Sequence, residues 1–124
     1  MQSRVSFTQV ARRLEESDVI VFPIYLDTEY EEVFERGNSS SEAYAVARDQ
    51  LERLSELTGG QMFKAEKVGD LSGVYKQVAA AIRTVYSVGY YPTNPDKDGT
   101  FRRVKVEVNR SDAAVRTRKG YYAK

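Results

Sequence analysis

The sequence predicts an α/β fold of three layers, with a mixed and mostly parallel sheet and an appended C-terminal antiparallel β-hairpin. Up to residue 92, strand-like apolar runs alternate with segments of helical spacing, an order typical of parallel sheets. After residue 92, two basic segments flank a turn, which indicates a hairpin. We expect residues 1–92 and the hairpin unit 93–124 to pack on the same sheet as a single structural unit.

The first helix and the first strand follow each other directly. Residues 6–17 have apolar side chains at helical spacing, and Ser6 with Gln9 has the spacing of a capping box. Residues 18–26 are a nearly continuous apolar run, which is typical of a buried parallel strand covered by helices on both faces. Pro23 removes one backbone donor from this run, but a strand remains the best interpretation.

Two further helices enclose a short strand. The second helix begins near residue 41 and ends at Gly59 and Gly60, which supply a left-handed stop. Residues 61–65 form the short strand, and Asp70 is the expected N-cap of the third helix. The apolar stripe of that helix consists of Leu71, Val74, Tyr75, Val78, Ile82 and Val85.

Three more strands are expected towards the C-terminus. Residues 86–91 have strand composition and are stopped by Pro92. A segment rich in turn formers follows, and residues 101–108 then alternate, with valines at 104, 106 and 108 on one face. Residues 114–122 form the last strand. Two copies of Gly-Tyr-Tyr, at 89–91 and 120–122, each close one of these strands.

The composition excludes several kinds of chemistry. The 124 residues include 41% hydrophobic and 30% charged side chains, which is typical of a globular protein. The chain contains no Cys and no His, so zinc sites, thiol catalysis, Ser-His triads and disulfides all lack the residues they need. No membrane span and no signal peptide are predicted. The location stays open, and would be periplasmic or secreted if a signal peptide is encoded upstream.

Charge is distributed unevenly. Residues 1–100 carry 11 Lys and Arg against 16 Asp and Glu, whereas residues 101–124 carry 8 against 2. Such a basic segment could bind nucleic acid or another anionic partner. It is also what the solvent face of an antiparallel sheet looks like, because Lys and Arg discourage edge pairing. The second interpretation is favoured, since no stacking aromatics alternate with the basic residues.

Several segments together resemble a known family. They are residues 57–63 (LTGGQMF), 70–71 (DL), 90–94 (YYPTN), 101–108 (FRRVKVEV) and 118–122 (RKGYY). In this pattern the chain is similar to the C-terminal half of bacterial von Willebrand factor type A-related proteins, of the sort abundant in acidobacteria. The resemblance covers nearly the whole chain.

The resemblance implies a protein-interaction or adhesion-type fold. Type A domains bind a divalent cation through an Asp-x-Ser-x-Ser motif in their N-terminal half, and this motif does not occur in the chain. No metal-site residue is therefore carried over, and the chain is expected to be a fragment or a truncated relative without that site. An acidic loop with Asp27, Glu29, Glu31, Glu32 and Glu35 matches no calcium-loop spacing, and solvation is its favoured interpretation.

The sequence therefore predicts a non-enzymatic protein-interaction module without a cofactor. A protein partner is expected, with a homodimer or a strand-exchanged assembly as the form of the isolated chain. The alternative is an anion- or nucleic-acid-binding module that uses the basic hairpin, with nucleic acid disfavoured as the ligand. Residues expected to contact a partner are Tyr90, Tyr91, Arg103, Lys105, Arg118, Tyr121 and Tyr122.

Overall fold

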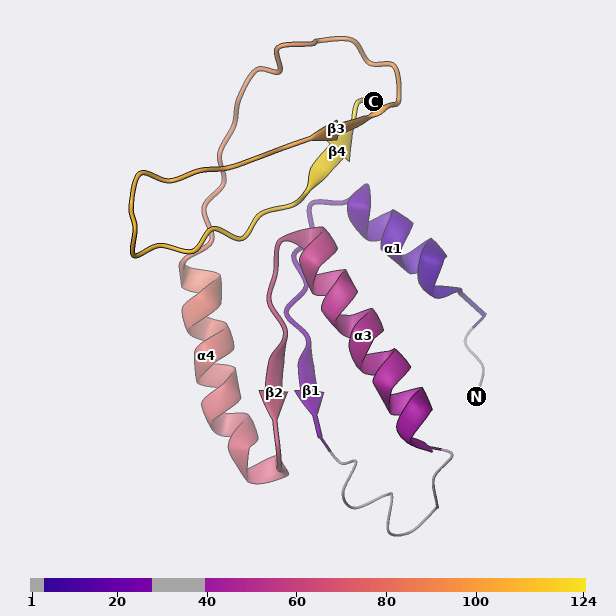
Figure 1. The fold of residues 1–124 in the computed structure, drawn as a ribbon, viewed down its shortest axis with the longest axis vertical. Coiled ribbons are helices and arrows are strands. Elements are labelled where there is room, and N and C mark those ends of the chain that lie inside the picture. The colour runs from indigo at the N-terminus through magenta and orange to yellow at the C-terminus, as the bar shows by residue number, and fades with distance from the viewer. Residues whose placement is uncertain (1–3, 28–39) are drawn as a thin grey trace.

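The computed structural model describes residues 4–27 and 40–124 (Figure 1). Within these residues the chain is mixed α/β, with three α-helices, one parallel pair of strands and one antiparallel pair. The α/β class is confirmed at this level. The two pairs are not hydrogen-bonded to each other, so the predicted single mixed sheet is not seen among the described residues.

Helix α1 (Phe7–Glu15) starts with the capping box that the sequence predicts. The backbone N–H of Gln9 donates to the Ser6 hydroxyl at 3.3 Å, and the backbone N–H of Ser6 donates to the Gln9 side chain at 3.0 Å. Two of the unpaired amides at the helix start are thereby satisfied. Helix α1 packs against helix α3.

Helix α3 (Ser40–Thr58) ends in a Schellman motif. Gly59 has φ +76°, a conformation that favours glycine because it has no Cβ. The N–H of Gly60 donates to the carbonyl of Ser55 at 2.8 Å, and the N–H of Gly59 donates to that of Glu56 at 3.3 Å. The predicted left-handed stop is confirmed.

Strands β1 (Ile24–Leu26) and β2 (Phe63–Ala65) pair in parallel, with Ile24 opposite Phe63 and Leu26 opposite Ala65. Both are shorter than the sequence predicts. Pro23 lies just before β1, and its carbonyl accepts from the N–H of Phe63 at 2.8 Å. Pairing therefore includes this proline through its acceptor, although it has no N–H to donate.

A 3₁₀ turn, η1 (Val68–Asp70), leads into helix α4 (Leu71–Arg83). Asp70 is the N-cap residue of α4 as predicted, but its side chain makes no capping hydrogen bond to that helix. Its carboxylate accepts from the backbone N–H of Lys67 at 3.2 Å and so closes the 3₁₀ turn instead. The predicted N-cap position is confirmed, and the side chain serves the preceding 3₁₀ turn, which the sequence pattern does not reveal.

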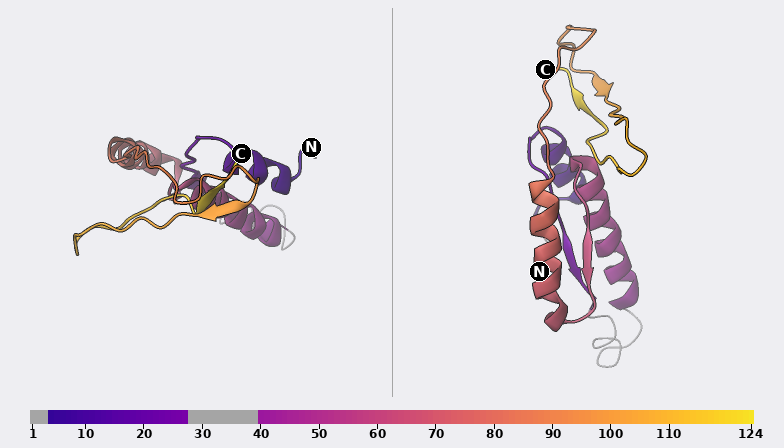
Figure 2. Two further views of the ribbon diagram at one scale, coloured as in Figure 1. Left: turned by 90° about the horizontal axis from the view of Figure 1, so that it is seen from above. Right: turned by 90° about the vertical axis from the view of Figure 1, so that its left-hand side faces the viewer.

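The core lies where α4 covers one face of the parallel pair. Phe63, Ala65 and Val74 are buried there. Figures 1 and 2 place the two strands between α3 and α4. Only part of the predicted α4 stripe faces this core, since Tyr75 is 62% and Ile82 54% exposed. Nothing in the described part of the chain covers that side of α4.

No strand forms over residues 86–91, where the sequence predicts one. The chain leaves α4 and runs on without regular structure, and every residue from 84 to 100 is exposed. The prediction was wrong for this structure because a strand needs a neighbour, and no described segment pairs with this one.

The predicted C-terminal hairpin is present with shorter strands. Strand β3 (Phe101–Arg103) pairs antiparallel with β4 (Gly120–Tyr122). One further bond follows, from the N–H of Val104 to the carbonyl of Lys119 at 2.9 Å. Beyond it the predicted valine face is not covered, and Val106 and Val108 are exposed. The arm of the hairpin stands clear of the helices (Figure 2).

Candidate interaction surface

Three of the predicted contact residues line one cavity. It has a volume of about 200 Å³ and lies between the residue 90–94 segment and the hairpin. Tyr90, Arg103 and Tyr121 contribute to its lining, and their contact with a partner stays a prediction. The other lining residues are Pro92, Thr93, Asn94 and Arg102.

The two tyrosines of this cavity interact. Partial burial raises the pKa of Tyr90, and a hydrogen bond with Tyr121 raises it further. A tyrosine hydroxyl can both donate and accept a hydrogen bond, so each of the two phenols can also bond to a further polar group. Tyr90 belongs to the first Gly-Tyr-Tyr segment and Tyr121 to the second, so the structure joins the two copies at one place.

Arg102 lines the cavity and also forms hydrogen bonds to the neighbouring turn. One of its Nη atoms donates to the carboxylate of Asp98 at 3.0 Å and to the carbonyl of Asp96 at 3.4 Å. Hydrogen bonds from Thr100, and then the charge of Arg102, hold the pKa of Asp98 below its ordinary value. The Nε atom of Arg102 is buried and has no partner among the described residues. The guanidinium thus keeps one donor unused near the cavity.

Gly120 allows the two hairpin strands to approach closely. A Cβ on this residue would lie 2.0 Å from the carbonyl oxygen of Arg102 and 2.7 Å from the Phe101 ring. Only glycine fits at this distance, and that gives a physical reason for the glycine in the second Gly-Tyr-Tyr segment. The first copy has no such reason, because the space around Gly89 is open.

Arg118 links the hairpin to the N-terminal part of the chain. Its Nη1 donates to the carbonyl of Leu14 at the end of α1 at 3.1 Å, and its Nη2 donates to the carbonyl of Val19. The backbone of residues 117–118 also lies against Gly59, where a Cβ would come within 3.0 Å of the Arg118 nitrogen. Arg118 is therefore engaged inside the chain.

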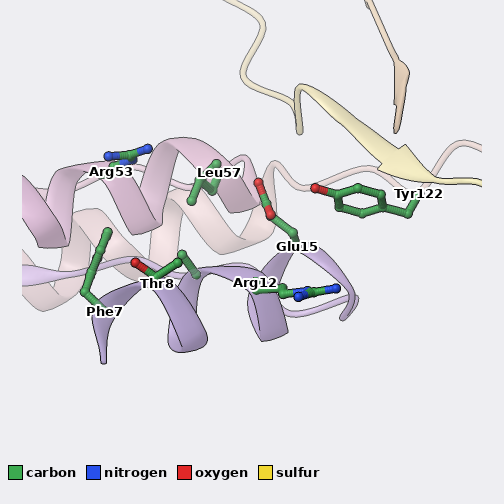
Figure 3. Close-up of a pocket in the computed structure, with 8 residues that line it drawn as sticks. Phe7, Thr8, Arg12, Glu15, Arg53, Leu57 and Tyr122 are labelled. Carbon is green, nitrogen blue, oxygen red and sulfur yellow. The ribbon is translucent and has the colours of Figure 1, made fainter. Parts of the chain in front are cut away.

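Tyr122 faces a different groove from Tyr121. Its ring meets Phe101 edge to face at 5.2 Å. On its other side lies a groove of about 350 Å³ between α1 and α3 (Figure 3). The hydroxyl of Tyr122 points towards Glu15 there. Residues lining this groove include Phe7, Thr8, Ala11, Arg12, Glu15, Arg53 and Leu57.

An ion pair between Lys124 and Glu16 holds the C-terminal end of the chain beside this groove. The Nζ of Lys124 lies 2.9 Å from the Glu16 carboxylate. The hydrogen bond from Lys124, followed by its charge, lowers the pKa of Glu16. Together with Arg118, this pair places the end of the hairpin against α1.

The remaining two predicted contact residues lie apart from both cavities. Tyr91 is fully exposed, at 100% of its surface. Lys105 forms an exposed ion pair with Glu107 on the hairpin arm. The seven predicted residues therefore do not form one surface, and the strand alternation that separates Tyr121 from Tyr122 explains part of this.

The acidic loop is only partly described. Asp27 pairs with Lys64 at 2.8 Å. The other four acidic residues, Glu29, Glu31, Glu32 and Glu35, lie outside the described residues. Among the residues that are described, no group of three or more acidic, His or Cys side chains is placed to hold a metal ion.

Sequence reasoning missed Lys124, Glu16 and the role of Arg102. The close approach of backbone at Gly120 could have been predicted from the sequence, because a glycine inside a strand pattern indicates such an approach. The contacts of Arg118 and Lys124 join residues about a hundred positions apart, and no local spacing encodes them.

No family model, curated protein or solved structure gives a significant match to this chain. The resemblance to type A-related proteins therefore stays a prediction. No helix in the described part of the chain is long and apolar enough to cross a membrane.

Proposed function

We propose that the chain is a non-enzymatic protein-interaction module related to the C-terminal half of a type A domain. One observation supports this most: apolar surface stays uncovered along α4 and the segment that follows it. A compact monomer of 14.1 kDa exposes about 6,700 Å². The chain exposes 10404 Å², about 3,700 Å² more than that estimate.

The uncovered side chains are large and recur every few residues from Tyr75 to Tyr91. Tyr86 is 84%, Val88 78% and Tyr91 100% exposed, and Tyr75 and Ile82 precede them on α4. Single exposed apolar residues are normal, but several on one helix and the segment that follows it are what an interaction surface would supply. Tyrosine is also enriched among the residues that carry binding energy at interfaces.

The finer architecture belongs to the same proposal. Two parallel strands alone make a poor sheet, because parallel sheets are normally larger and buried on both faces. We expect a partner chain or further strands to extend the β1–β2 pair into the three-layer, mostly parallel sheet that the sequence predicts. The series on α4 would then be covered at the same time.

The alternative, binding of an anion or nucleic acid by the basic hairpin, is less well supported. Five of its eight Lys and Arg residues are engaged within the chain, namely Arg102, Lys105, Arg110, Arg118 and Lys124. Arg103, Arg116 and Lys119 have no ion pair with any described residue. We expect any DNA binding by the chain to be weak, and the double variant Arg103→Glu, Arg116→Glu should not change it. A large loss of salt-dependent binding in that variant would favour the alternative.

A photo-crosslinking experiment tests the proposed function. Benzoylphenylalanine in place of Tyr91 should give discrete protein adducts in cells, because this side chain is fully exposed on the proposed surface. The matched control places the same probe at Val46, which is 56% exposed on α3, and Figure 1 shows α3 on the other side of the β1–β2 pair from α4. Equal adduct yields at the two positions, or none at either, would contradict the proposal.

A further inference from the structure

The segment of residues 86–91 has an unused backbone. Its N–H and C=O groups make no hydrogen bond with any described residue. The last bond before it runs from the N–H of Val85 to the carbonyl of Ile82 at 3.3 Å. A run of exposed strand-forming residues with unpaired backbone groups is a template for pairing with another chain.

Its sequence is that of a strand. Tyr, Val and Ser occupy most positions, and Tyr86, Val88 and Tyr90 fall on one face in the alternation of a strand. Pro92 ends the segment, since it has no N–H to donate. The missing element is therefore a neighbouring strand, which would turn this exposed segment into regular structure.

Charge indicates which neighbour fits. Residues 84–92 contain no charged side chain. Pairing of β2 or β3 with its own copy would place like charges near each other, because β2 carries Lys64 and β3 carries Arg102 and Arg103, whereas β1 and β4 are uncharged but already paired with these strands. Residues 86–91 can pair with themselves without that cost. An acidic or basic partner would find no opposite charge on this segment.

We propose that residues 86–91 of two copies of this chain pair antiparallel about a two-fold axis at Val88. This inference rests on the proposed function and specifies its partner. In that register Val88 lies opposite Val88 of the second copy, and Tyr86 lies opposite its Tyr90. Aromatic pairs directly across two strands are among the stabilising contacts of a sheet. The symmetry makes the contact closed, with each copy giving the same surface.

Exposed apolar side chains for such a contact lie on α4 and on the segment that follows it. A stable interface buries about 800 Å² on each partner, so the paired strands need neighbouring surface as well. Helix α4 runs directly into residues 84–92 (Figure 1). Tyr75 and Ile82 on α4 would add to the contact around the paired strands.

Charge variants at Val88 test this pairing. Val88 is 78% exposed, so Val88→Lys and Val88→Glu should each fold. Each substitution places like charges opposite each other at the two-fold axis and should weaken self-association by at least about tenfold. An equimolar mixture should restore association as a heterodimer, which a loss of folding could not do. Val46→Lys is the matched control and should self-associate like the unsubstituted chain.

Sedimentation velocity of the purified chain over a range of concentrations gives the readout. A wild-type dimer, monomeric single variants and a restored mixed dimer are the expected results. A monomeric wild-type chain, open-ended oligomers, or a mixture that stays monomeric would overturn the proposal.

The Tyr91 crosslinking experiment separates this inference from the proposed function. Adducts with the mass of two copies of this chain support both. Adducts with other proteins alone would overturn the self-pairing and leave the interaction module standing. No adduct above the Val46 control would overturn both.

Discussion

Replacing Arg118 by alanine should loosen the hairpin from the rest of the chain. The guanidinium donates to two backbone carbonyls, those of Leu14 and Val19. A hydrogen bond with a charged partner contributes about 1.5–3 kcal/mol net. Val19 is 52% exposed, so water can replace that bond, and we count the Leu14 bond in full and the Val19 bond in part. The expected loss is about 2–3 kcal/mol in the free energy of unfolding.

Urea denaturation followed by far-ultraviolet circular dichroism measures this loss. For a domain of this size, about 1 kcal/mol corresponds to about 4 °C in Tm, so thermal melting should show a decrease of about 10 °C. Arg118→Lys should fall between wild type and Arg118→Ala, because a lysine ammonium cannot span both carbonyls as the planar guanidinium does.

Arg116→Ala is the matched control. Arg116 lies two positions away on the same arm of the hairpin and is exposed, with no hydrogen bond or ion pair to a described residue. Its substitution should change the free energy of unfolding by less than about 0.5 kcal/mol. If Arg118→Ala lost no more stability than Arg116→Ala, the assignment of Arg118 as the link to α1 would be refuted.

Three further outcomes follow from the same contacts. Gly60→Ala should destabilise the chain by at least about 1–3 kcal/mol in urea titrations, because its Cβ would lie 1.9 Å from the Val21 carbonyl oxygen; a neutral effect would contradict the close approach. Thr58→Val should lose about 1–3 kcal/mol, since the Val21 N–H would lose its 3.0 Å bond to the buried hydroxyl, while Thr58→Ser should retain most stability. The pKa of Glu16 is lowered from 4.5 by Lys124, so its contribution to stability is present above pH 4.5 and lost as pH falls through the lower folded value. Glu16→Gln should remove that part of the acid dependence, and an unchanged pH profile would argue against the ion pair.

The helix caps and turns that depend on nearby residues were predictable from the sequence. The capping box of Ser6 and Gln9 and the left-handed stop at Gly59 both depend on residues within a few positions of each other. The hairpin was also predictable, because turn formers separate two alternating segments. These features need no knowledge of the rest of the fold.

The extent of the strands was not predictable in the same way. Residues 86–91 have strand composition, yet pairing depends on a neighbour that the described chain does not offer. Val106 and Val108 have the right alternation but nothing to pack against. A strand-like composition indicates that a segment can form a strand when another strand pairs with it. In the structure these segments have no such neighbour among the described residues.

The sequence did not predict how the proposed contact residues are grouped. Tyr90, Arg103 and Tyr121 line one cavity, and their role as a contact surface stays a prediction. Arg118 carries the same charge as Arg103 but is engaged in the chain, because its position brings it against the end of α1. The sequence alone does not distinguish an arginine that contacts a partner from one that donates to a carbonyl of the same chain.

Hydrogen exchange at the amides of residues 86–91 tests the central claim most directly. These amides have no hydrogen-bond partner among the described residues and should exchange quickly at low protein concentration. If the segment pairs with a second copy, their protection should rise with concentration, and Val88→Lys should abolish the rise while Val46→Lys leaves it intact. Fast exchange at every concentration, or protection already complete in the monomer, would contradict the account.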